Sequence, residues 1–329
     1  MSFIDSKVLG FDVAYKDYKT RIPRGNREFV MSNGELCEFV NCPAKWIAGT
    51  GEDDETDALT WGTAIDVLGP HPERFDELYA VAPSTYRNEK GEDRPWNWNA
   101  LVCRKWRDEQ GEKTVIKHEL QTKIIQALKA LCESEIQPLI DCSKTQVHVL
   151  GHWKDKATGL VIPVQCLIDF VPDKSNATWG RTLANFKTAR CGDPNTFACV
   201  VADRGYDSSA ALEMDLYISA TSEDRTDFLI PIQENTPPYH VVKPMIALSA
   251  EFLAFGHAKY SIALREYARC LETNQWPSYS TGERLVIGPT QIVGPESVWR
   301  YRESGGAVAS RQDYQPEPTR EPSTDGITP

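Results

Sequence analysis

The chain has 329 residues and a mass of 37.0 kDa, enough for one large domain or two small ones with a buried core. Its composition, 41% hydrophobic and 25% charged, is that of an ordinary globular protein and excludes collagen-like and coiled-coil classes. The net charge of −11 counts against binding of nucleic acid through overall positive charge. A local basic surface stays open, because net charge does not describe the local field.

The chain contains no apolar run near the roughly 18 residues that a membrane span needs. Its start, MSFIDSKVLG, lacks a basic region followed by an apolar stretch, so we expect a cytoplasmic protein with no membrane partner. Nine cysteines, an odd number without any C-x-x-C pair, indicate reduced thiols in a reducing compartment. Gly-rich phosphate-binding loops are absent from the sequence, which argues against a nucleotide-hydrolysing or dinucleotide-dependent enzyme.

The middle of the chain predicts a helix followed by three strands. Apolar residues recur every three to four positions over Glu119–Ile140, the spacing of an amphipathic helix. Thr145–Trp153 and Leu160–Val171 alternate in polarity around a turn-rich link and predict a hairpin. Thr182–Thr188 predicts a third, short strand.

The following segment predicts further helices and one more strand. Asp193 precedes a proline and predicts an N-cap for a helix that continues through Val201. A second helical pattern follows Gly205, Thr226–Gln233 alternates as a strand, and Met245–Asn274 predicts a long helix. This order of elements predicts a mixed α/β fold around one sheet.

Three polar residues on two predicted strands form the candidate site. Asn185 and Lys187 stand two apart and would project from one face of the third strand. Asp169 lies near the end of the preceding strand. An acid, a gap, and then a polar residue and a lysine two apart is the layout of PD-(D/E)XK nucleases. In that layout carboxylates hold Mg²⁺, and the metal and the lysine together activate water. The spacing by itself is weakly specific.

Longer segments of the chain, in order from Ser32 to Tyr279, resemble the RecE-like, exodeoxyribonuclease VIII-type branch of the PD-(D/E)XK superfamily. The resemblance implies a restriction-endonuclease-like fold, a central mixed β-sheet flanked by helices. It also implies a metal-dependent exonuclease that digests one strand of duplex DNA in phage-type recombination. The matching segments are FVNCPAKW after Ser32, WGTAIDVLGPHPERFDELYAVAP at Trp61–Pro83, HWKDKATGLVIPVQCLIDFVP at His152–Pro172, NFKTARCGDPNTF at Asn185–Phe197, RGYDSSAALEMDLY at Arg204–Tyr217, IPIQENTPPYHVV, and YARCLETNQWPSY at Tyr267–Tyr279.

The chain departs from the family pattern at most of the site positions, which leaves Asp169 and Lys187 as the matching pair. Asp66 stands where relatives carry a histidine, and His148 is expected where they carry a glutamate on the first hairpin strand. Asn185 replaces the aspartate of D-x-K. The glutamine and tyrosine of the following helix correspond to Ser209 and Glu213.

The resemblance implies Mg²⁺ or Mn²⁺ as the cofactor of an active enzyme, with Asp169, Asn185 and His148 as candidate ligands. Replacing one carboxylate by an amide beside a divalent cation costs about 4 kcal/mol at 4 Å and an effective dielectric near 20. That is on the order of a thousandfold in rate. Two rescues are conceivable: His148 selecting a softer ion such as Mn²⁺ or Zn²⁺, or Glu213 supplying the missing carboxylate. The alternative function is an inactive nuclease-fold protein that serves as a DNA-binding or protein-interaction subunit.

A segment from position 87 to 107 interleaves basic and aromatic residues, a pattern that suits a DNA strand with stacked bases. Inward packing of the tryptophans with solvated charges is an equally good interpretation. The candidate DNA-binding residues are Arg87, Arg94, Trp96, Arg104 and Lys105.

We expect four regions: an N-terminal region at 1–60 packing on the core, a nuclease-like domain at 61–280, an extension at 281–302, and a disordered tail at 303–329. The tail is rich in Gly, Pro, Ser and Glu and has little to bury. The resemblance implies duplex DNA with free ends as substrate, a single-strand annealing protein as partner, and a homo-oligomer that forms a ring. No residue pattern in the chain encodes the partner or the ring.

Overall fold

The computed structural model describes residues 3–49, 57–243 and 245–279. The predicted extension at 281–302 and the predicted tail lie outside the described residues. No helix in the described part of the chain is long and apolar enough to cross a membrane.

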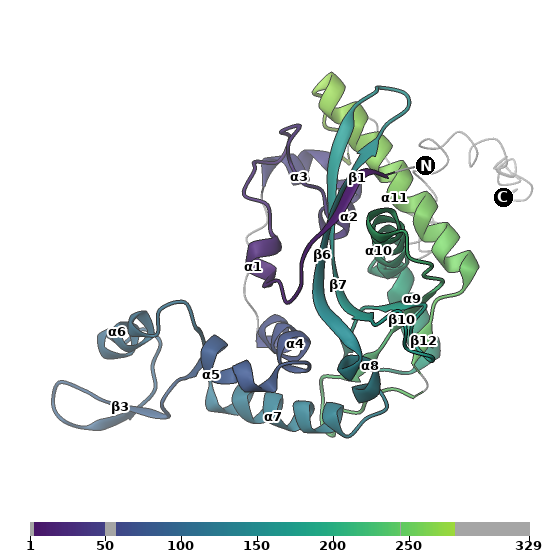
Figure 1. Cartoon of the computed structure of the whole chain (residues 1–329). Helices are drawn as coiled ribbons and strands as arrows, with labels where there is room; N and C mark the ends of the chain where they lie inside the picture. Colours follow the sequence, from purple (N-terminus) through teal and green to yellow (C-terminus); the bar gives the residue numbers. More distant parts are fainter. Residues whose placement is uncertain (1–2, 50–56, 244, 280–329) are drawn as a thin grey trace, which may run out of the picture. The chain divides into compact units, whose positions relative to one another are not determined.

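A six-stranded mixed sheet forms the centre of the fold, as the sequence predicts (Figure 1). Antiparallel pairs predominate, and β8 and β10 are parallel. The predicted hairpin is confirmed and supplies the two longest strands, β6 and β7. In spatial order the strands are β1 (Phe3–Gly10), β6 (Ser143–Lys154), β7 (Val161–Pro172), β8 (Thr182–Ala184), β10 (Asp227–Ile230) and β12 (Ile246–Ala247).

The turn between β6 and β7 shows why this part of the sequence folds locally. Asp155 is buried, and its carboxylate accepts hydrogen bonds from both the backbone N–H and the hydroxyl of Thr158. Gly159 follows with φ of 73°, a backbone conformation that favours glycine. The residues of the turn therefore set the register of the whole hairpin.

Helix α10 (Tyr206–Thr221) packs across β1, β6 and β7, and α11 (Ala250–Thr273) runs along its other side (Figure 1). Because α10 is covered on both sides, its buried residues are spread around the whole helix and include Asp207, Ser208 and Glu213. Helix α9 (Pro194–Asp203) precedes it, and the side chain of Asp193 caps α9 by accepting from Thr196 N–H. The helices predicted after Asp193 and Gly205 are confirmed.

A second hydrophobic cluster joins α4 (Asp57–Leu68) and α7 (His118–Cys132) to the sheet. Residues Trp61 and Ile65 of α4 pack in one cluster with Phe170 and Phe186. Phe170 and Phe186 are the sequence neighbours of Asp169 and Lys187, so their packing in this cluster fixes the segments that carry the candidate site.

Four sequence predictions differ from the structure in their boundaries. The predicted strand at Thr182–Thr188 is two strands, β8 and β9 (Lys187–Ala189), separated by Asn185 and Phe186. The predicted strand at Thr226–Gln233 is interrupted at Pro231, and its second half is β11 (Ile232–Glu234), which pairs in parallel with β9. The predicted helix at Glu119–Ile140 ends at Cys132 and continues as α8 (Gln137–Asp141) after a turn. The predicted long helix begins only at Ala250, and β12 occupies the positions before it.

The strand β1 was not predicted, although it forms one edge of the central sheet by pairing with β6. The remaining described elements are short and surround the core. They are α1 (Tyr15–Tyr18), α2 (Asn33–Asn41), α3 (Pro43–Ala48), a 3-10 turn at Pro72–Arg74, α5 (Phe75–Leu78), β2 (Tyr79–Val81), β3 (Thr85–Arg87), β4 (Asp93–Pro95), α6 (Leu101–Glu109) and β5 (Thr114–Ile116).

Candidate active site

Asp169 of β7 and Lys187 of β9 meet as the sequence predicts. The distance from Lys187 Nζ to Asp169 Oδ2 is 3.7 Å, and both side chains are largely buried. The same carboxylate oxygen accepts from Phe186 N–H at 2.8 Å, and Lys187 Nζ donates to the Phe186 carbonyl at 2.9 Å. The break between β8 and β9 therefore places a backbone donor and an ammonium group on one carboxylate.

Asn185 connects this carboxylate-bearing strand to helix α10. Its Oδ1 accepts from Asp169 N–H at 2.9 Å, and its Nδ2 donates to Glu213 Oε1 at 2.9 Å. Ser209, one turn earlier on α10, donates to the same Glu213 oxygen at 2.7 Å. Glu213 Oε2 is buried and has no hydrogen-bond partner among the described residues. Glu213 thus lies directly against Asn185.

Three carboxyl groups at the site have raised pKa values, and Asp169 interacts electrostatically with the other two. Burial raises the pKa of Asp66 to about 8, and the charge of Asp169 contributes to this rise. Burial also raises the pKa of Glu213 to about 8, against the effects of Ser209 and Lys187. The pKa of Asp169 is raised by burial too, although Lys187 and Phe186 N–H oppose the shift. Around neutral pH Asp66 and Glu213 therefore hold protons for most of the time.

Lys187 keeps its proton despite its burial. Burial lowers the pKa of its ammonium group, but the charges of Asp169 and Asp66 outweigh that effect, so the pKa lies above its ordinary value. Its Nζ also lies 5.5 Å from the centre of the Tyr206 ring, within cation–π range. The site therefore contains a permanent cation surrounded by carboxyl groups of variable charge.

Gln146 is the site residue that the sequence analysis missed. Its Nε2 donates to Asp169 Oδ1 at 3.1 Å. Its φ is 45°, and the pairing of β6 with β7 runs from Thr145 with Phe170 to Val147 with Ile168 without a regular pair at Gln146. Extending the register in which Trp153 lies opposite Ile162 would have placed Gln146 opposite Asp169.

His148, the predicted metal ligand on β6, lies two residues along the strand from Gln146, the residue that contacts Asp169. His148 pairs with Leu167 across the hairpin, two residues from Asp169. Its Nε2 lies 3.0 Å from Gln165 Oε1, and its ring meets the edge of Tyr18 at 5.3 Å. The strand direction carries the imidazole toward Gln165, so none of its described contacts is with Asp169.

The donor set of the site fits a magnesium-type ion better than a zinc-type ion. Among the described residues, no group of three or more His, Cys, Asp or Glu side chains could hold a metal ion. Mg²⁺ requires less from the protein, since it binds through one or two carboxylates and completes its shell with water and substrate phosphate oxygens. Asp169 and the unpartnered Oε2 of Glu213 meet that requirement, whereas the oxygen of Asn185 already accepts from Asp169 N–H.

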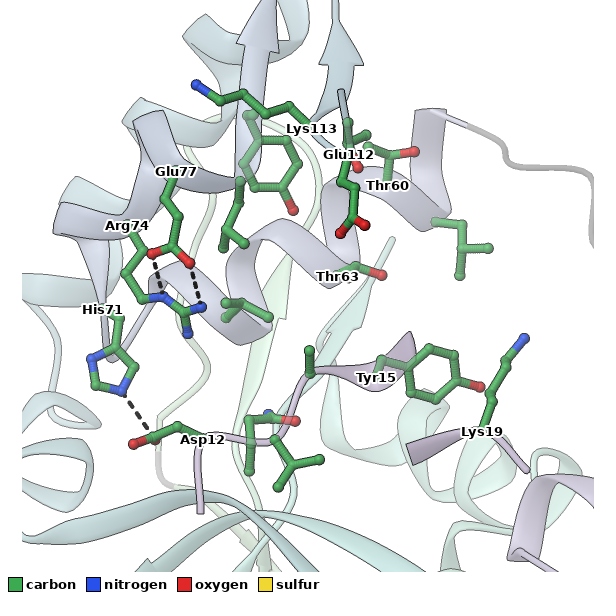
Figure 2. Close-up of a pocket in the computed structure, with 18 of the residues that line it drawn as sticks. Asp12, Tyr15, Lys19, Thr60, Thr63, His71, Arg74, Glu77, Glu112 and Lys113 are labelled. Carbon is green, nitrogen blue, oxygen red and sulfur yellow. Dashed lines mark hydrogen bonds and ion pairs between the residues drawn. The ribbon is translucent and has the colours of Figure 1, made fainter. Parts of the chain in front are cut away.

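A pocket of about 850 Å³ adjoins the site (Figure 2). Gln146 lines it, and so do Thr63 and Val67 of α4, the helix that carries Asp66. Arg74 and Glu77 neutralise each other within the wall, because Arg74 donates to Glu77 at 3.1 Å, and His71 contacts Asp12 at 3.2 Å. The remaining lining is mixed polar and apolar, which suits an organic ligand with hydrogen-bonding groups more than a simple ion.

The candidate DNA-binding residues lie on the hairpin of β3 and β4, directly after it at Trp96, and on α6, and no described contact joins them to Asp169. Arg87 pairs with Asp93 at 3.4 Å and Arg94 with Glu92 at 2.7 Å, so both cations have acidic partners. Arg104 and Lys105 are exposed on α6. The three tryptophans of the segment pack on one another: the ring of Trp96 lies 5.7 Å from Trp98 and 5.2 Å from Trp106.

Comparisons with known proteins identify a similar structure but no family. No family model matches the chain. No curated protein matches it either. Among solved structures, it is similar to a candidate exonuclease from Eubacterium rectale, with a TM-score of 0.49 and 13% identity, over 87% of this chain and 100% of that one. At this level of likeness, function has to be argued from the site itself.

Proposed function

We propose that the protein is a metal-dependent hydrolase that cleaves phosphodiester bonds in DNA. The observation that carries the proposal is the contact at 3.7 Å between Lys187 Nζ and Asp169 Oδ2, because it joins a carboxylate ligand to a cation able to meet a phosphate. The order of Asp169, Asn185 and Lys187 and the resemblance of the longer segments to RecE-like nucleases support the same chemistry.

In this proposal Asp169 and Glu213 hold Mg²⁺ or Mn²⁺. A divalent cation bound there supplies a Lewis acid for the phosphate and lowers the pKa of a bound water. A cation held there would also offset the burial and the repulsion by Asp169 that keep Glu213 and Asp66 protonated in the protein alone. Glu213 thereby restores, from helix α10, the negative charge that Asn185 lacks.

Lys187 acts on the phosphate and on the nucleophile. Its ammonium group keeps its charge through the acids around it, and so it can neutralise the charge that develops on the phosphate or orient the attacking water. Asn185 holds the break between β8 and β9 in place, because its amide bonds both Asp169 N–H and Glu213. Positioning of this kind is what makes two groups on separate elements act together.

More specifically, we propose that the hydrolase is a RecE-like exonuclease that acts on duplex DNA with free ends. Arg104 and Lys105, the exposed candidates on α6, would contact the DNA backbone, and Trp96 would contribute a stacking surface. Arg87 and Arg94 contribute less because acids pair with them. Assembly into a ring and cooperation with a single-strand annealing protein belong to the same proposal, and the resemblance alone supports them.

The decisive assay measures hydrolysis of linear and of closed circular duplex DNA with Mg²⁺ or Mn²⁺. We expect degradation of the linear form, its loss in Lys187→Ala and Asp169→Asn, and its retention in Lys156→Ala, which removes an exposed lysine of the hairpin turn. Equal degradation of DNA by the wild type and Lys187→Ala would show that Asp169 and Lys187 are not the catalytic site. DNA binding and Mn²⁺ binding without hydrolysis would favour the alternative, an inactive nuclease-fold subunit.

A further inference from the structure

Gln146 has a backbone conformation that the β-strand around it does not require. Its φ of 45° is in the left-handed region, which residues other than glycine seldom occupy. The strand pairs regularly with β7 immediately before and after it. Backbone strain next to a candidate site points to a role for the side chain at the strained position.

The surrounding contacts hold this conformation in place. The Gln146 carbonyl accepts from Val13 N–H at 3.2 Å, and the Thr145 carbonyl accepts from Asp12 N–H at 2.8 Å. The Thr145 hydroxyl also donates to the Asp12 carboxylate. The segment before α1 therefore pairs with β6 at Thr145 and Gln146 and holds the positive φ of Gln146.

The Gln146 side chain stands between the pocket and the Asp169 carboxylate. Gln146 lines the pocket of Figure 2 and donates to Asp169 Oδ1, whereas Asp169 is not among the residues that line the pocket. Helix α4 also contacts both the pocket and the acid cluster. Thr63 and Val67 line the pocket, and Asp66 interacts with Asp169 and Lys187. The pocket and the acid cluster are therefore separated by α4 and by one amide.

We propose that the pocket is the route by which a nucleic-acid strand reaches Asp169, and that Gln146 is the positioning residue that closes it. While its amide is on Asp169, the carboxylate is held in orientation and shielded from the pocket. When the amide turns toward the pocket, Asp169 is open to a cation and to the phosphate of the strand. The nature of the strand rests on the proposed function, but the access route does not.

Access can be measured without any metal or substrate. Carbodiimide labelling of carboxyl groups, read by mass spectrometry in the presence of a chelator, reports the accessibility of Asp169. Gln146→Gly removes the amide and suits the positive φ, so it is expected to fold with an unchanged or higher Tm. We expect labelling of Asp169 to rise several-fold in this variant, and labelling of the exposed Glu133 to stay constant.

A second variant tests that the route runs through the pocket. Thr63→Trp fills the pocket from the exposed face of α4. The double variant Gln146→Gly and Thr63→Trp is expected to return Asp169 labelling toward the wild-type level. Unchanged labelling in Gln146→Gly, or a rise that Thr63→Trp does not reverse, would overturn the inference.

The positioning role has its own readout. In the proposal the amide leaves Asp169 before a cation can bind there, so Mn²⁺ is expected to associate several-fold faster with Gln146→Gly than with the wild type. Stopped-flow mixing with MnCl₂ measures this rate. If the wild type neither binds Mn²⁺ nor cleaves DNA, the proposed function fails, whereas the labelling result still decides on the access route.

Discussion

Lys259 of α11 and Asp207 of α10 form an ion pair at 2.8 Å in which both side chains are fully buried. Burial raises the pKa of Asp207, and Lys259 opposes the shift, so the pair depends on both partners. The pair fixes the first turn of α10, the helix that carries Ser209 and Glu213 into the candidate site. The position of the site's second carboxylate therefore depends on a contact on the far side of its helix.

Lys259→Met is expected to lower the free energy of unfolding by about 3–5 kcal/mol, because it leaves a buried carboxylate without its cation. The double variant Lys259→Met and Asp207→Asn is expected to recover most of that loss. Urea denaturation at pH 7 measures both. Lys243→Met breaks an exposed pair with Glu135 and should cost about 1 kcal/mol or less. A double variant no more stable than the single one would contradict the buried pair as the cause.

Gly256 allows α11 to lie directly on the backbone of α10. A Cβ at this position would lie 2.0 Å from the carbonyl oxygen of Asp207. Gly256→Ala is therefore expected to push the helices apart and to lower the free energy of unfolding by about 1–3 kcal/mol or more, measured by thermal unfolding. Gly34→Ala in α2 is the matched control, since its nearest neighbour is a side-chain oxygen at 3.9 Å, and it should stabilise the helix by about 1 kcal/mol. Equal effects of the two substitutions would refute the close contact.

Stability is expected to depend on pH through Glu213. Its pKa of about 8 in the folded protein exceeds its ordinary value of 4.5, so folding is favoured by the bound proton. That contribution is complete below pH 4.5 and is lost as the pH rises to about 8. At about 1.4 kcal/mol per pKa unit it amounts to a few kcal/mol.

Glu213→Gln should therefore raise Tm most at pH 8 and above and least near pH 5, when Tm is measured with chelator present. Glu133→Gln, at an exposed position, serves as the control with no such trend. Added Mg²⁺ should reduce the difference at high pH, because a bound cation stabilises the ionised carboxylate. A difference independent of pH would show that Glu213 is not protonated in the folded protein.

Asn185→Asp places a further carboxyl group between Asp169 and Glu213 and removes the donor to Glu213 Oε1. Without metal we expect a loss of about 1–3 kcal/mol at pH 8, because a buried hydrogen bond is replaced by repulsion. With Mn²⁺ we expect that loss to be regained and the affinity for Mn²⁺ to rise. Thermal unfolding with and without MnCl₂ tests both, with the exposed Asn97→Asp as the control. A loss that Mn²⁺ fails to reverse would count against a metal at this position.

Binding of DNA by α6 predicts a dependence on salt. Replacing Arg104 and Lys105 by glutamate should weaken binding and lower the slope of log affinity against log salt by about 1 for each phosphate that the protein no longer neutralises. Replacing Lys156, an exposed lysine of the hairpin turn, by glutamate should leave the slope nearly unchanged. Fluorescence anisotropy with linear duplex DNA at several salt concentrations measures these slopes. Identical slopes for the two variants would show that α6 is not part of the DNA-binding interface.

The sequence predicted those parts of the fold whose signals are local. The hairpin of β6 and β7, the cap at Asp193 and the meeting of Asp169 with Lys187 follow from alternation, turn residues and spacing. Strand β1 could not be predicted in this way, because its place at the edge depends on pairing with β6, more than a hundred residues away. The positive φ of Gln146 is likewise held by contacts with Asp12 and Val13, which no local pattern of the strand reveals.

The break after Asn185 and the proline at position 231 lie side by side in neighbouring strands. Ala184 pairs with Leu229 before the break, and Lys187 pairs with Ile232 after it. The two neighbouring segments therefore have the same number of residues between these pairs. Inserting or deleting one residue in either chain alone would put the lysine out of step with the acid it faces. Variation in length is therefore expected to occur in both strands together or in neither, a constraint useful to anyone grafting this region onto another scaffold.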